Sequence, residues 1–172
     1  MISSPPSVIR LAQYTTTELD EITGGVPDPF GVAGTGLTWL PKEAHFGVRD
    51  HDRLVAHAGL VRVTVAVGAA RSPVAGLGGV VVAPDARGRG LARAVVAAAM
   101  AHARDTGAEY GLLFCLPERV PLYEHLGWRL VDGGLDVEQP GGPVRMPLPA
   151  LWTPLAGGAW PAGRAALLSL PM

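Results

Sequence analysis

The stretch from residue 74 to residue 105 constrains the fold more than any other part of the chain. Residues 74–83 are almost wholly apolar, which is typical of a strand buried on both faces. Pro84 ends this strand, and a glycine-rich turn follows. Apolar residues at helical spacing then predict a helix through about Asp105, which Gly107 ends. A buried strand joined to a helix in this way is typical of an α/β domain.

The remaining patterns predict further strands and two shorter helices in one domain covering residues 1–172. No internal repeat or long linker divides the chain. Residues 26–40 are compatible with either a loop or a short helix, and the Gly- and Pro-rich residues 140–163 predict loops. We expect strands at 8–11, 45–49, 53–67, 110–116, 128–131, 144–148 and 165–170, a turn at 68–73, and helices at 18–22 and 121–126.

Composition excludes several classes of protein. The net charge of −1 argues against broad binding to nucleic acid. The single cysteine, Cys115, excludes an internal disulfide and a Cys-rich zinc site. No apolar run is long enough for a membrane span, and residues 1–6 lack the pattern of a signal peptide. We therefore expect a cytoplasmic enzyme without a metal. Lys42 is the only lysine among 14 basic residues, which we attribute to coding bias.

The turn before the predicted helix has the features of a phosphate site. A helix N-terminus offers unpaired N–H groups, and glycines let a phosphate approach them. Arg87 and Arg89 could add charge-assisted contacts. A dinucleotide fingerprint would need glycine where Arg93 stands, and a P-loop would need a lysine that the turn lacks. The alternative is an arginine-rich turn that only caps the helix.

The pattern around this turn resembles a known motif. Val82 and Pro84 form Val-x-Pro, and Arg87, Gly90 and Ala92 form Arg-x-x-Gly-x-Ala. Together they resemble motif A of the GCN5-related N-acetyltransferase (GNAT) superfamily, which binds the pyrophosphate of acetyl-CoA. The resemblance implies acetyl-CoA as co-substrate, held by the residues of the strand, the turn and the helix start. These residues are Val80, Val81, Val82, Arg87, Gly88, Arg89, Gly90, Leu91 and Ala92.

A second motif supports the same family. Residues 122–128, Leu-Tyr-Glu-His-Leu-Gly-Trp, resemble the closing Leu-Tyr-x-x-x-Gly-Phe/Trp element of the superfamily. The resemblance implies that Tyr123 protonates the departing CoA thiolate, although a tyrosine there could also pack in the core. It also implies a mixed, mostly antiparallel sheet of about six or seven strands, splayed at the cofactor, with helices on both faces.

The resemblance extends to aminoglycoside 2′-N-acetyltransferases. Trp39, residues 44–49 and residues 54–60 are similar to the front half of that family, and residues 160–163 to its C-terminal Trp-x-Ala-Gly. We expect the amine substrate to bind at Trp39, Gly78, Gly79 and Phe114. Trp39 could stack on a sugar there or could instead fill the core.

This chain lacks acidic residues that the aminoglycoside family carries. Gly78 stands in place of its strand glutamate, and Ala33, Gly141 and Gly142 replace other acidic positions. Because a polycationic substrate needs carboxylates to replace its hydration, a less cationic amino-sugar or small amine fits better. Carboxylates that could substitute are Asp28, Glu43, Asp136 and Glu138.

Transfer to an amine also needs an oxyanion donor and a route for the amine proton. A backbone N–H near Val80 is the expected oxyanion donor. His57 is the main candidate for the base because an imidazole titrates near neutral pH, although a histidine on an apolar strand is more often a core residue. His45, Glu43, Glu118 or water are further candidates for the base. Cys115 has no paired base and is expected to be a buried hydrophobe.

These features favour an acetyl-CoA-dependent N-acetyltransferase for a small amine, plausibly an aminoglycoside-like antibiotic or amino-sugar of low positive charge. Two alternatives remain at this stage. One is acetylation of a peptide or protein amine, and the other is a non-catalytic acyl-CoA-binding module. Residues 165–172 read as an exposed sheet edge, which allows a homodimer through strand pairing.

Overall fold

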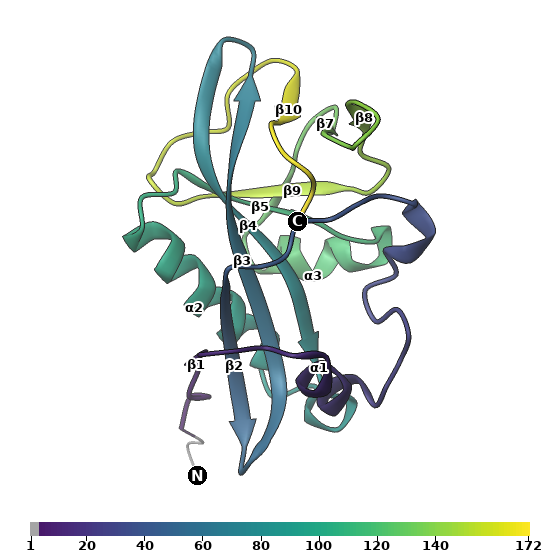
Figure 1. Cartoon of the computed structure of the whole chain (residues 1–172). Coiled ribbons are helices and arrows are strands. Elements are labelled where there is room, and N and C mark those ends of the chain that lie inside the picture. The colour runs from purple at the N-terminus through teal and green to yellow at the C-terminus, as the bar shows by residue number, and fades with distance from the viewer. Residues whose placement is uncertain (1–3) are drawn as a thin grey trace.

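The computed structural model describes residues 4–172. Residues 1–3, which belong to the segment that lacks a signal-peptide pattern, lie outside the described residues. Across the described chain, ten strands form one mixed sheet in the order β6-β9-β5-β4-β3-β10-β7-β8, with β2 and then β1 beside β3 (Figure 1). The strands are β1 (Ile9–Leu11), β2 (Ala44–Asp50), β3 (Arg53–Val67), β4 (Ala70–Val82), β5 (Tyr110–Phe114), β6 (Arg129–Leu130), β7 (Leu135–Val137), β8 (Val144–Arg145), β9 (Ala150–Pro154) and β10 (Ala165–Leu167).

Three α-helices accompany the sheet within residues 4–172: α1 (Thr16–Thr23), α2 (Leu91–Asp105) and α3 (Val120–His125). Alternation along β2 shows that α1 and α2 cover opposite faces. Phe46 contacts His102 of α2, with ring centroids 5.5 Å apart. The neighbouring His45 contacts Tyr14, just before α1, at 5.2 Å. None of the helices in this described part is long and apolar enough to cross a membrane.

The sheet opens between its two central strands. β4 and β5 run parallel and are paired from Val74 with Tyr110 to Leu77 with Leu113. Beyond this register the second half of β4 pairs only with β3, where a bulge lies between His57 and Gly59. The expected splayed, mostly antiparallel sheet with helices on both faces is confirmed. The splay exposes one edge of β4 where motif A begins, and residues 79–82 are half-buried. The prediction that this part of the strand is buried on both faces is therefore wrong.

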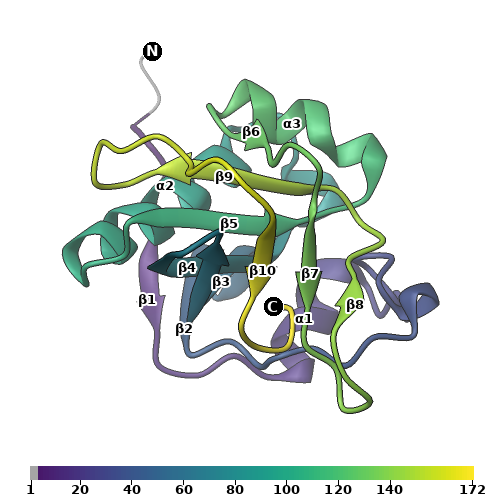
Figure 2. The same ribbon diagram turned by 90° about the horizontal axis from the view of Figure 1, so that it is seen from above.

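Several predicted boundaries are wrong. β4 begins at Ala70, so the turn predicted at 68–73 contains only two residues between the strands. The Gly- and Pro-rich segment predicted as loops contains β9, which pairs with β5 along its whole length. β10 is not an exposed edge, because it pairs with β3 on one side and β7 on the other (Figure 2). The homodimer was predicted to form through a free sheet edge at residues 165–172, and β10 does not provide that edge.

Candidate active site

A cleft of about 1040 Å³ lies where β4 and β5 diverge. It runs from the N-terminal end of α2, past the bulge of β4, to aromatic side chains before β2. Among the residues predicted to bind the cofactor, Arg89 does not line it. The predicted residues that do are Trp39, His57, Gly78, Gly79, Val80, Val81, Val82, Arg87, Gly88, Gly90, Leu91, Ala92, Phe114 and Tyr123.

The glycine-rich turn leaves the N-terminus of α2 open toward the cleft. Gly88 and Gly90 have φ angles of +77° and +74°, which glycine adopts without steric strain. A Cβ at either glycine would meet nothing within 4 Å. The first turn of α2 closes with a bond from Ala94 N–H to Gly90 O at 3.1 Å, so the helix itself leaves the preceding N–H groups unpaired. This end of the cleft fits a pyrophosphate.

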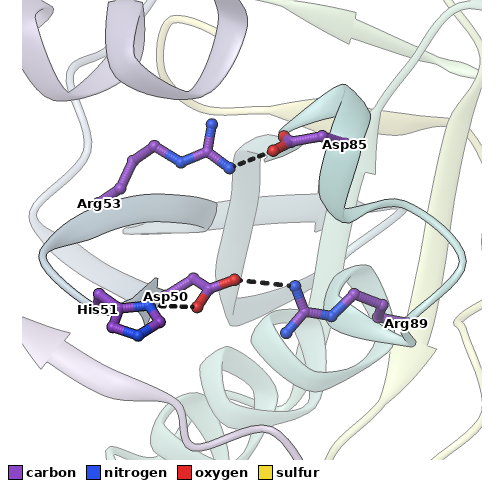
Figure 3. Close-up of polar contacts among 5 residues, drawn as sticks. All are labelled: Asp50, His51, Arg53, Asp85 and Arg89. Carbon is purple, nitrogen blue, oxygen red and sulfur yellow. Dashed lines mark hydrogen bonds and ion pairs between the residues drawn. The ribbon is translucent and has the colours of Figure 1, made fainter.

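The hairpin between β2 and β3 contacts this turn through side chains that do not line the cleft. Figure 3 shows these contacts. Arg53 Nη2 lies 2.6 Å from Asp85 Oδ2, and Arg89 Nη1 lies 3.2 Å from Asp50 Oδ2. His51 Nδ1 is 3.0 Å from the other oxygen of Asp50. These contacts lower the pKa of Asp50, chiefly through the hydrogen bond from Arg89. Arg89 therefore fixes the turn to the hairpin and is directed away from the cleft.

Tyr123 reaches the cleft from α3. Its ring packs edge-on against Trp128, with centroids 6.2 Å apart, and the residue is buried. Burial raises the pKa of Tyr123 well above 10, so its hydroxyl is protonated at neutral pH. Cys115 also lines the cleft and is half-buried, with its pKa raised by burial to about 11. The cleft thus holds a phenol that can donate a proton and a thiol that stays neutral.

The bulge of β4 is locked by a histidine pair. Gly79 has a φ of +62°, and its carbonyl oxygen lies 2.7 Å from His57 Nδ1. A carbonyl only accepts, so Nδ1 carries the hydrogen. His57 Nε2 lies 2.9 Å from His45 Nδ1. Tyr14 stacks on the His57 ring with centroids 3.6 Å apart.

These contacts favour a positioning role for His57 over the predicted role as base. The residue is 1% exposed, and burial lowers its pKa to about 4. Both ring nitrogens are engaged, so neither is free to take a proton from a substrate. His57 therefore holds the Gly79 bulge, which immediately precedes Val80.

The opposite end of the cleft is aromatic and contains one cation that sequence reasoning missed. Trp39 lies edge-on to Phe114, with ring centroids 6.4 Å apart. Lys42 lines the cleft beside them, and burial lowers its pKa to about 8. The sequence offered one signal for this residue, since Lys42 is the only lysine of the chain. We attributed that to coding bias and therefore gave the residue no role.

No aspartate or glutamate is among the described residues that line this cleft. Two of the proposed substitutes are engaged elsewhere. Asp28 accepts bonds from the N–H groups of Val32 and Ala33, and Asp136 pairs with Arg164 at 2.7 Å. Within residues 4–172, no three His, Cys, Asp or Glu side chains gather closely enough to hold a metal ion.

Solved structures resemble this chain over much of its length. A GCN5-related N-acetyltransferase from Kribbella flavida is 25% identical with a TM-score of 0.51, over 76% of this chain and 35% of that one. This chain thus spans about a third of the Kribbella protein. A GNAT family N-acetyltransferase from Escherichia coli, solved with CoA, has a TM-score of 0.61 at 15% identity, over 98% and 93% of the two chains.

A GNAT family acetyltransferase from Brucella melitensis, solved with acetyl-CoA, has a TM-score of 0.55 at 15% identity, over 93% of this chain and 95% of that one. At such identities these two likenesses concern the fold. No curated protein matches the sequence. Residues 38–131, more than half of the chain, match the acetyltransferase (GNAT) domain family. The chain therefore belongs to the GNAT acetyltransferase family.

Proposed function

We propose that this chain transfers the acetyl group of acetyl-CoA to a small amine of low positive charge. The observation that carries the proposal is one continuous cleft, which joins the open N-terminus of α2 to the protonated Tyr123. The Escherichia coli and Brucella relatives were solved with CoA and acetyl-CoA, which supports the same donor here. Residues 1–172 are proposed to act as one domain, supported by the single sheet that contains both β1 and β10.

Each part of the cleft has a distinct proposed task. Bound acetyl-CoA would supply an acyl group activated as a thioester. The N–H groups at the start of α2, with Arg87, hold the pyrophosphate. An N–H near Val80, directed by the Gly79 bulge, stabilises the negative charge that develops on the carbonyl oxygen. Tyr123 gives its proton to the departing sulfur.

The charge of the cleft argues for the class of amine. Among the described residues, its lining includes cationic side chains but no Asp or Glu side chain, so a multiply charged aminoglycoside would lose hydration without gaining ion pairs to acidic side chains. An amino-sugar antibiotic with few charges, or another small amine, avoids this cost. Trp39 and Phe114 provide an apolar wall against which such a body can pack. Desolvation there would also help the amine lose its proton, so that no dedicated base is required.

The test is release of CoA from acetyl-CoA in the presence of single amines, followed with a thiol reagent. The panel contains multiply charged aminoglycosides, amino-sugars of low charge, polyamines and short peptides. We expect turnover with amines of low charge and at least about tenfold lower kcat/KM for polycations. Preferred turnover of polycations or peptides would contradict the proposed substrate class. Absence of acetyl-CoA binding, measured by calorimetry, would contradict the proposed reaction.

A further inference from the structure

The side chain of Lys42 reaches the cleft over two glycines that are partners on neighbouring strands. Gly59 of β3 and Gly78 of β4 are partners in the strand register. A Cβ at Gly59 would lie 2.7 Å from Lys42 Cγ, and a Cβ at Gly78 would lie 2.6 Å from Cε and 3.0 Å from Nζ. The lysine chain therefore crosses both strands over these two glycines, and a Cβ at either position would force it to shift. Its amine reaches β4 one residue before the Gly79 bulge.

No Asp or Glu side chain pairs with this amine, since no ion pair among the described residues involves Lys42. Its surroundings include the rings of His45 and His57, which are also potential cations, and the backbone of Met172, whose carbonyl carbon would lie 3.5 Å from a Cβ at Gly78. With its pKa lowered to about 8, about half of this amine is neutral at pH 8. A lysine in water, with a pKa of about 10.4, is neutral to well under 1% at that pH. A neutral amine is the nucleophilic form.

The chain uses arginine at every other basic position. A guanidinium does not lose its proton in proteins, whereas a buried lysine amine does. Among the lysine and arginine side chains of the sequence, the one that can become a nucleophile therefore lies in the cleft. A merely electrostatic role at this position would be equally open to arginine.

We propose that Lys42 is itself an acetyl acceptor, modified on Nζ by acetyl-CoA bound in the same chain. The inference rests on the proposed acetyl-CoA site. The neutral Nζ attacks the thioester carbonyl carbon, a C–N bond forms and the C–S bond breaks. Tyr123 protonates the sulfur, and the proton released from Nζ returns to Tyr123 through solvent. One acetyl-CoA and one lysine thus give one CoA and one acetyl-lysine. The chain's own lysine competes for the acetyl group whenever an external amine is absent.

The experiment is mass spectrometry of the full chain after incubation with acetyl-CoA and no added amine. We expect a gain of one acetyl group, mapped to Lys42 by peptide analysis, with one CoA released per chain. Peptide mapping separates this lysine from the N-terminal amine. The rate per chain is expected to be independent of protein concentration, because the reaction is intramolecular. Tyr123→Phe is expected to slow it at least about tenfold.

Lys42→Arg keeps the charge but offers no neutral amine, so this variant is expected to gain no acetyl group. Wild-type chain unfolded in urea controls for spontaneous acetylation and is expected to react far more slowly. Folded chain that binds acetyl-CoA by calorimetry, yet leaves Lys42 unmodified, would overturn the inference and leave the proposed function standing. Equal labelling of folded and unfolded chains would overturn it as well. Failure to bind acetyl-CoA would overturn both.

Discussion

The buried His57 is expected to make the stability of this protein depend on pH. Burial lowers the pKa of His57 from its ordinary value of 6.5 to about 4. The unfolded chain therefore takes up this proton at a higher pH than the folded chain does. Because stability rises with pH wherever the unfolded state binds more protons, the contribution is complete above pH 6.5. It is lost as the pH falls from 6.5 toward 4.

The magnitude follows from the difference between the two pKa values. A fall from 6.5 to about 4 corresponds to about 3 kcal/mol when the full titration is included. Integration from pH 8 to pH 5 gives a loss of about 2 kcal/mol, because the folded state is still largely unprotonated at pH 5. Burial is the main cause, and the hydrogen bond to Gly79 O opposes it only in part.

The assay is urea unfolding, followed by tryptophan fluorescence, at pH 8 and pH 5. His57→Asn replaces the imidazole with a group that does not titrate but can still donate toward Gly79 O. We expect the wild-type chain to lose about 2 kcal/mol more than this variant. His125→Asn, at an exposed position of α3, is the matched control and is expected to follow the wild type. The same pH dependence in wild type and His57→Asn would refute the reasoning.

Four further variants test the site. Tyr123→Phe is expected to lower kcat at least about 100-fold without changing the affinity for acetyl-CoA; an unchanged kcat would contradict the role of the phenol as acid. Arg87→Ala is expected to weaken acetyl-CoA binding about tenfold in calorimetry, whereas Arg89→Ala, outside the cleft, changes it less than about twofold; the reverse order would contradict this assignment. Gly79→Ala would place a side chain at a φ of +62°, with its Cβ 3.2 Å from His57 Cε1. We expect it to lower the free energy of unfolding, measured in urea, by about 1–2 kcal/mol. An unchanged free energy of unfolding would argue against a tightly held bulge.

Elements with local signals could be predicted from the sequence. α1 is flanked by Thr15, which forms a capping box with Glu18, and by Gly24 at a φ of +72°; threonine before a helix and glycine after it are local signals that a sequence shows directly. β9 could not be predicted in the same way. It is a short strand within a segment rich in Gly and Pro, and its pairing with β5 depends on tertiary contacts instead of a local pattern.

The same distinction applies to the site. The turn before α2 and Tyr123 each belong to a contiguous sequence motif. Because both motifs resemble the same family, the sequence predicted that they share one cleft. The place of Lys42 in the cleft could not be predicted, because it depends on the strand register that pairs Gly59 with Gly78. Arg89 was assigned to the cofactor on its position in the motif, but the hairpin that engages it lies about forty residues earlier in the chain.

The central claim is that the open start of α2 binds the pyrophosphate of acetyl-CoA. The most direct test is calorimetric titration of the chain with acetyl-CoA and, separately, with S-acetylpantetheine, which carries the same thioester but no pyrophosphate. We predict that acetyl-CoA binds at least about 100-fold more tightly, because only it offers phosphates to the free N–H groups and Arg87. Equal affinity for the two compounds, or no binding of acetyl-CoA, would contradict the claim.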